Sequence, residues 1–149
     1  MEKKTAQAAN RGTIMTQVWR KFSVILVVMV AFTACNRMEP VYNVEEQAIP
    51  SGTQQKISSE QVGKIIAKAA LDKGWLVNET KPGLLHCTIK WRDHSAVVDI
   101  TYSNQSYSIE LDTSQNLKES DGMIHRKYNE RVQALQKEID KKLSIVAYN

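Results

Sequence analysis

Three stretches in the second half of the chain alternate apolar and polar residues, which is the two-residue period of a β-strand. They cover residues 84–92, 95–103 and 107–113. Short polar turns at Asp93-His94 and Asn104-Gln105 separate them, and Asp and Asn tolerate the left-handed backbone conformations of tight turns. The pattern therefore predicts an antiparallel meander.

The alternation also predicts the pairing of these strands. If both turns contain two residues, the apolar side chains of all three strands lie on one sheet face, and a slip of one residue would mix the faces. This register pairs Trp91 with Ala96, Ile89 with Val98, Cys87 with Ile100, Leu85 with Tyr102, Tyr102 with Tyr107, Ile100 with Ile109, and Val98 with Leu111.

A further strand is expected to begin at Trp75 and Val77, before the Pro82-Gly83 turn signal. A two-residue turn there would place both side chains on the wrong face of the sheet. We therefore predict a longer loop with an odd number of residues, which brings them opposite Trp91 and Ile89.

Apolar residues at helical spacing occur both before and after these strands. A first helix is expected from the N-cap Ser58, with Gln61 completing a capping box and Gly74 ending the helix. Its apolar stripe is Val62, Ile65, Ile66, Ala69 and Ala70. A second helix is expected over residues 123–143, with the stripe Ile124, Tyr128, Val132, Leu135, Ile139 and Leu143. With both helices on the apolar sheet face, residues 58–149 are predicted to form a small two-layer α+β domain.

The charge is unevenly distributed along the chain. The sequence has 20 Lys and Arg against 16 Asp and Glu, and the whole excess lies in residues 1–34. The remainder is balanced, so no nucleic-acid partner is expected. After Arg20-Lys21 comes an apolar run of 13 residues, Phe22 to Ala34. A membrane-spanning helix needs about 20 such residues, whereas this order and length are typical of a signal peptide over residues 1–34. Met15 is an alternative start.

The end of this run, Phe32-Thr33-Ala34-Cys35, resembles the lipobox of bacterial lipoproteins, although Phe32 replaces the usual leucine. The resemblance implies a diacylglycerol on the sulfur of Cys35, removal of the leader, and an acyl chain such as palmitate on the new amino group. Two or three acyl chains anchor a protein stably. The alternative is an ordinary leader or short anchor with an incidental cysteine.

Residues 35–57 are predicted to be the lipidated N-terminus and a flexible tether, with a reach of roughly 25 Å. A short extended piece at Val41–Val44 could dock on the domain. The resemblance to lipoproteins also gives a meaning to position 36. An Asp there resembles a signal for retention in the inner membrane, so Asn36 favours the outer membrane in a Gram-negative source. The inner membrane, or the cell membrane of a Gram-positive source, remains the alternative. With Cys35 lipidated, Cys87 has no partner in the chain and is expected in the core.

Several short motifs extend across residues 58–143. They are Gly74-Trp75, Pro82-Gly83, Tyr107–Ile109, Ser114–Leu117 and Ile124–Asn129. Together they resemble a family of small proteobacterial lipoproteins of unassigned function. The resemblance supports the α+β architecture and implies no activity.

The polar sheet face is the candidate binding surface, formed by His86, Thr88, Asp99 and Glu110. The predicted register places Asp99 beside both Glu110 and Thr88, and His86 beside Thr101. Two adjacent carboxylates can shift each other's pKa as acid–base catalysis requires, so a small hydrolase using Asp99 and Glu110 is one alternative. A solvated face is the simpler interpretation.

No metal or other cofactor is expected, because His86, His94 and His125 lack the spacing of a zinc site. Cys87 points into the predicted core, away from any base. The main hypothesis is a non-enzymatic, lipid-anchored envelope protein that presents its domain to an envelope protein in the periplasm, through the polar face or a strand edge. A carrier for an apolar ligand between helices and sheet is a further alternative.

Overall fold

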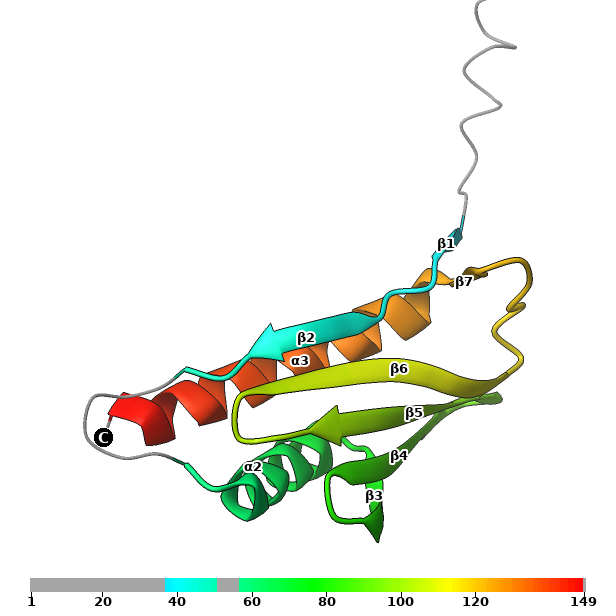
Figure 1. Cartoon of the computed structure of the whole chain (residues 1–149). Helices are drawn as coiled ribbons and strands as arrows, with labels where there is room; N and C mark the ends of the chain where they lie inside the picture. Colours follow the sequence, from blue (N-terminus) through cyan, green and yellow to red (C-terminus); the bar gives the residue numbers. More distant parts are fainter. Residues whose placement is uncertain (1–36, 51–56, 149) are drawn as a thin grey trace, which may run out of the picture. The chain divides into compact units, whose positions relative to one another are not determined.

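The computed structural model describes residues 37–50 and 57–148 of the chain (Figure 1). The predicted signal peptide, residues 1–34, and Cys35 lie outside the described residues. The described elements are β1 (Met38–Pro40), β2 (Val44–Ala48), α2 (Ser59–Asp72), β3 (Leu76–Lys81), β4 (Leu84–Trp91), β5 (His94–Tyr102), β6 (Ser106–Gln115), β7 (Met123–His125) and α3 (Arg126–Tyr148). A five-stranded antiparallel sheet has the order β2-β6-β5-β4-β3, and β1 pairs with β7.

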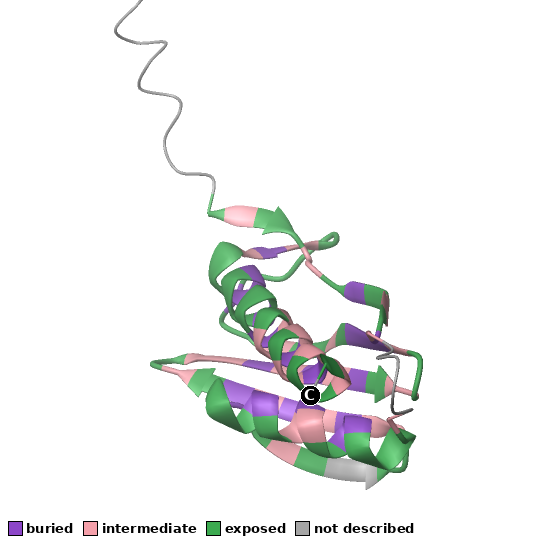
Figure 2. Cartoon of the chain, turned by 90° about the vertical axis from the view of Figure 1, so that its left-hand side faces the viewer, coloured by how far each residue is buried: buried purple, intermediate pink, exposed green. Residues whose placement is uncertain are grey.

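The predicted α+β architecture is confirmed. Buried residues alternate along the strands and recur at helical intervals along α2 and α3 (Figure 2). The capping box at Ser58 and Gln61 is present, and five residues of α2 are buried. All six apolar residues expected on the second helix have no exposed surface. The core therefore lies between one face of the sheet and the two helices.

The second hairpin has the predicted register. Tyr102 lies opposite Tyr107, and Ile100 lies opposite Ile109. The register shifts between Val97 and Val98, where an irregularity in β5–β6 moves Val97 opposite Thr113.

The predicted register of the first hairpin is wrong by two residues. Its turn is at Arg92-Asp93, and Arg92 has a φ of 53°. Cys87 therefore lies opposite Val98 instead of Ile100. A shift of two residues keeps every side chain on its face, so the alternation alone does not exclude it. The turn is held from outside, because the Asn116 side-chain amide donates to the Asp93 carbonyl over 2.6 Å.

The strand before Pro82-Gly83 also differs in detail from its prediction. Val77 lies on the core side but opposite Cys87, and the turn contains only the two residues Pro82 and Gly83. A bulge between Glu79 and Lys81 supplies the extra residue. The predicted change of face is real, but a bulge produces it instead of a longer loop.

The second helix begins later than predicted. Met123–His125 forms strand β7, and α3 starts at Arg126. Ile124 is buried as expected, but as a strand residue. Pairing with β1 provides these residues with partners that the sequence pattern did not reveal.

The tether expected from residue 35 to residue 57 is largely part of the domain. β2 pairs with β6 at the edge of the main sheet, and Val44 is only 4% exposed. The Arg126 backbone N–H donates to the Arg37 carbonyl over 2.8 Å. The docking expected at Val41–Val44 thus extends on both sides, because pairing satisfies the backbone groups of this segment. Residues 51–56 lie outside the described residues.

One buried side chain joins this N-terminal segment to α3. Asn129 is 5% exposed, and its Oδ1 accepts the Tyr42 backbone N–H over 3.0 Å. Its Nδ2 donates to the Pro40 carbonyl over 2.9 Å and to a Glu39 carboxylate oxygen over 3.2 Å. We call this set of bonds the Asn129 clamp.

Replacing Asn129 with Ala should lower the free energy of unfolding by about 2 kcal/mol, because buried backbone groups lose their partners. Hydrogen exchange at the Tyr42 amide should accelerate in the same variant. Chemical denaturation and amide exchange measured by NMR check both effects. Gln133→Ala, at an exposed position of the same helix, is the control. Equal stability of the two variants would contradict the clamp.

Candidate functional site

The four residues predicted as a binding surface share the sheet face opposite the core, but their neighbours differ from the prediction. Asp99 lies opposite Glu110, as predicted. Its neighbour on the other side is His86 instead of Thr88, and the predicted pairing of His86 with Thr101 is also wrong. Both errors follow from the two-residue shift of the first hairpin.

The shifted register places an imidazole between carboxylates. His86 Nδ1 lies 2.6 Å from Asp99 Oδ1, and His86 Nε2 lies 3.9 Å from Asp112 Oδ2. The side chains of His86 and Asp99 are 35% and 39% exposed. Such a partly solvated pair orients the imidazole and leaves Asp99 engaged with His86. Among the described residues, no group of three or more His, Cys, Asp or Glu side chains has the geometry of a metal site.

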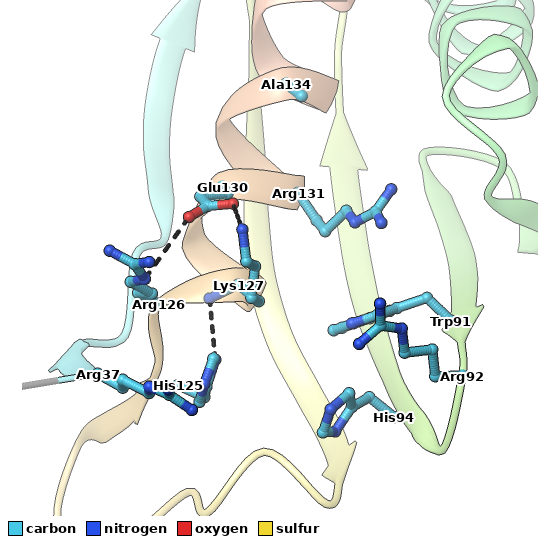
Figure 3. Close-up of a pocket in the computed structure, with 10 residues that line it drawn as sticks. All are labelled: Arg37, Trp91, Arg92, His94, His125, Arg126, Lys127, Glu130, Arg131 and Ala134. Atoms are coloured by element: carbon cyan, nitrogen blue, oxygen red, sulfur yellow. Dashed lines mark hydrogen bonds and ion pairs between the residues drawn. The ribbon is translucent and has the colours of Figure 1, made fainter. Parts of the chain in front are cut away.

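A second site lies at one end of the domain, and we call it the arginine pocket. It is a cavity of about 690 Å³. Figure 3 shows its basic and aromatic side chains on two sides of the hollow. The lining consists of Arg37, Trp91, Arg92, His94, His125, Arg126, Lys127, Glu130, Arg131 and Ala134.

Four separate parts of the fold position these side chains. One side comes from the end of β4, the turn after it and the start of β5, which carry Trp91, Arg92 and His94. The other side comes from Arg37 before β1, from His125 in β7, and from the first turns of α3. The sheet pairing of β1 with β7 places Arg37 beside the start of the helix.

The positive charge of the arginine pocket is only partly compensated. Glu130 pairs with Lys127 over 2.6 Å and lies 3.9 Å from Arg126. Among the described residues, no carboxylate lies within ion-pair distance of Arg37, Arg92 or Arg131. Five cationic side chains therefore surround the cavity with one carboxylate.

Two further features concern the cations of the arginine pocket. The first turn of α3 contains no acidic residue and begins with Arg126 and Lys127. Because the N-terminus of a helix carries a partial positive charge, cations there are unfavourable. The guanidinium of Arg131 lies 5.4 Å from the ring centroid of Trp91, a cation–π contact that orients both side chains.

His125 reports the electrostatic environment of the pocket. Burial lowers its pKa, and the nearby His94, Arg37, Arg126 and Lys118 lower it further. Its Nδ1 accepts the Lys127 backbone N–H over 3.2 Å, which also favours the neutral ring. The rings of His94 and His125 are stacked, with centroids 6.3 Å apart.

Sequence reasoning missed this site because its residues are dispersed. Arg37 falls in the predicted tether, Arg92 and His94 in a turn, and His125 and Arg126 at the edge of a helix. Each has a simple interpretation as a surface residue. The run His125-Arg126-Lys127 at a helix start was the available signal, since basic residues are disfavoured there.

A groove between α2 and the β3–β4 hairpin bears on the carrier hypothesis. It has a volume of about 800 Å³, and its apolar lining includes Leu71, Val77, Leu85 and Tyr102. Gly63 permits the close approach of Tyr102, since a β-carbon there would lie 2.5 Å from the phenol oxygen. Of these lining residues, Leu85 belongs to the buried core, and Val77 and Tyr102 pack against it.

Cys87 is buried, as predicted. Burial raises the pKa of its thiol to about 12, and the negative charge of Asp99 adds to this effect. The thiol is therefore protonated at neutral pH and is a poor nucleophile.

Comparisons with protein-family models, curated proteins and solved structures found no match to this chain. The resemblance to small proteobacterial lipoproteins thus stays a prediction. None of the described helices has the length and apolar character needed to cross a bilayer.

The Arg37→Gln variant should raise the pKa of His125, because one nearby cation is removed. NMR titration of the imidazole resonances measures this value directly. Lys137→Gln removes the same charge from α3 outside the pocket and should leave the pKa nearly unchanged. An unaltered pKa in Arg37→Gln would show that Arg37 does not contribute to the field at His125.

Proposed function

We propose that this chain is a lipid-anchored protein of the cell envelope whose small domain binds a ligand or partner at the membrane surface without catalysing a reaction. One observation carries the proposal. Arg37, two positions after Cys35, is already hydrogen-bonded to the domain and lines the arginine pocket. Residues 37–50 of the segment expected to be a long tether are thus part of the domain, which leaves Asn36 between the described domain and Cys35 in the sequence.

The covalent geometry limits how far the anchor lies from the domain. A fully extended chain spans at most about 3.6 Å per residue, so two residues span about 7 Å. If acyl chains fix Cys35 at the membrane surface, Arg37 lies within this distance of the anchored residue. The pocket end of the domain would then face the membrane, whereas a 22-residue tether would leave its orientation free.

The proposal also includes the cellular location of the protein. A diacylglycerol and an acyl chain on Cys35 would retain it in a membrane, and Asn36 favours the outer membrane in a Gram-negative cell, with the domain facing the periplasm. No cofactor other than this lipid is invoked. The polar face of His86, Thr88, Asp99 and Glu110 is open to an envelope protein partner on the side of the sheet opposite the helices.

The surroundings of Asp99 favour the binding hypothesis over a hydrolase that uses Asp99 and Glu110 as an acid–base pair. That carboxylate is engaged by His86 at 2.6 Å, and its partner Glu110 is exposed. An acid–base pair needs a substrate held between its two groups. The arginine pocket provides an enclosing surface, but its residues are cations suited to binding an anion.

Intact mass spectrometry of the membrane-extracted protein tests the anchor. The mature chain should begin at Cys35 and carry the added mass of a diacylglycerol and an acyl chain, because the lipobox cysteine is the acceptor. Cys35→Ala should lose this modification. Cys87→Ala removes the other cysteine and should keep it. An unmodified wild-type Cys35 would contradict the proposal.

A further inference from the structure

We infer that the arginine pocket binds the phosphate of an anionic lipid headgroup in the leaflet that holds the acyl chains of Cys35. The inference rests on the proposed function for the position of the pocket. It adds the class of ligand and the surface from which that ligand comes.

The side chains of the pocket have the chemistry of a phosphate site. A guanidinium offers parallel N–H donors that match two phosphate oxygens, and such charge-assisted bonds are stronger than neutral ones. Arg37, Arg92 and Arg131 have no carboxylate partner among the described residues. Their donors are therefore available to an anion entering the cavity.

The arrangement is unfavourable for the domain alone. Five cations surround one cavity with a single carboxylate, Glu130. Arg126 and Lys127 also lie at the positive end of a helix dipole. The chain after residue 34, with the pocket included, is balanced in charge, so this concentration of cations is local. A bound phosphate would relieve both the mutual repulsion and the dipole interaction.

The size and composition of the cavity match a headgroup better than an isolated ion. About 690 Å³ lies within the range of small-molecule sites. Trp91 and His94 provide flat surfaces beside the cations, with ring centroids 5.6 Å apart. Tryptophan is favoured where an apolar region meets polar headgroups, which fits contact with a glycerol backbone below the phosphate.

The connection to Cys35 selects the lipid as the source of phosphate. Arg37 is part of the pocket and lies two residues from the anchored cysteine. A lipid in the same leaflet is then present at high effective concentration, because anchor and ligand share a surface. A soluble phosphate compound has no such advantage.

The test uses the mature protein, with its acylation verified by mass, in nanodiscs of phosphatidylcholine containing increasing phosphatidylglycerol. Trp91 fluorescence is the readout, since Trp75, the other tryptophan after residue 34, is 1% exposed. The signal should change saturably with the anionic lipid. Trp91→Phe should remove the change.

Two double variants locate the binding site. Arg37→Gln with Arg92→Gln should weaken the apparent affinity for phosphatidylglycerol by about tenfold or more, since each guanidinium makes charge-assisted bonds. Neither residue stacks on Trp91. Lys137→Gln with Lys141→Gln removes the same charge from exposed positions of α3 and should retain the response. Circular dichroism and thermal melting check that both variants fold.

Three results would overturn the inference. They are a flat titration of the acylated protein, an equal loss in both double variants, or an equivalent response to glycerol 3-phosphate in nanodiscs of phosphatidylcholine alone. The last result would assign the pocket to a soluble phosphate compound. Missing acyl chains in the mass measurement would instead reject the proposed function, so the two failures are distinguishable.

Discussion

The Asn129 side chain fixes the path by which the chain enters the domain. Its amide oxygen and nitrogen bond the backbone of Pro40 and Tyr42, and an asparagine buried in a helix is stable only with such partners. Tyr42 adds a bond from its hydroxyl to Gln136 over 2.7 Å. These contacts hold β1 and β2 against α3, so that residues 37–50 belong to the folded domain.

The position of Arg37 follows from this constraint. With Tyr42 and Pro40 fixed, β1 pairs with β7, and the Arg37 carbonyl receives the first N–H of α3. The residue then reaches a cavity whose other side is the tip of the β4–β5 hairpin (Figure 3). The Asn129 clamp thus helps to bring Arg37, which lies two residues after Cys35 in the sequence, into the arginine pocket. In our proposal the anchor and the binding site are two ends of one short segment.

The sequence predicts the architecture because the buried faces of helices and strands require apolar residues at regular intervals. The stripe on α3 and the alternation in β5 and β6 were sufficient for the helix face and the second hairpin. The first hairpin shows the limit, since a shift of two residues preserves the faces of all side chains. The observed turn is instead held by a contact from outside the hairpin, the bond from Asn116 to the Asp93 carbonyl. The sequence pattern also cannot locate the bulge in β3. A bulge and a longer loop each add one residue, so both bring the following side chains to the same sheet face.

The candidate site was less accessible to sequence reasoning. The polar face was correctly predicted as a set of residues, but the contact of His86 with Asp99 depends on the register. The arginine pocket depends on tertiary contacts between residues far apart in the chain, such as Arg37, Arg92 and Arg131. Residues 36–57 also contain few apolar residues. The docking of residues 37–50 relies on backbone pairing and on the Asn129 clamp, which leave little trace in hydrophobic periodicity.

The most direct test is a measurement of which end of the domain faces the membrane. Lipids with a nitroxide on the headgroup quench tryptophan fluorescence at short range, and α3 extends about 34 Å from the pocket to Tyr148. In vesicles carrying the acylated protein, Trp91 should be strongly quenched. A tryptophan introduced by Tyr148→Trp in a Trp91→Phe background should be quenched far less. Equal quenching at both ends, or stronger quenching at residue 148, would contradict the account.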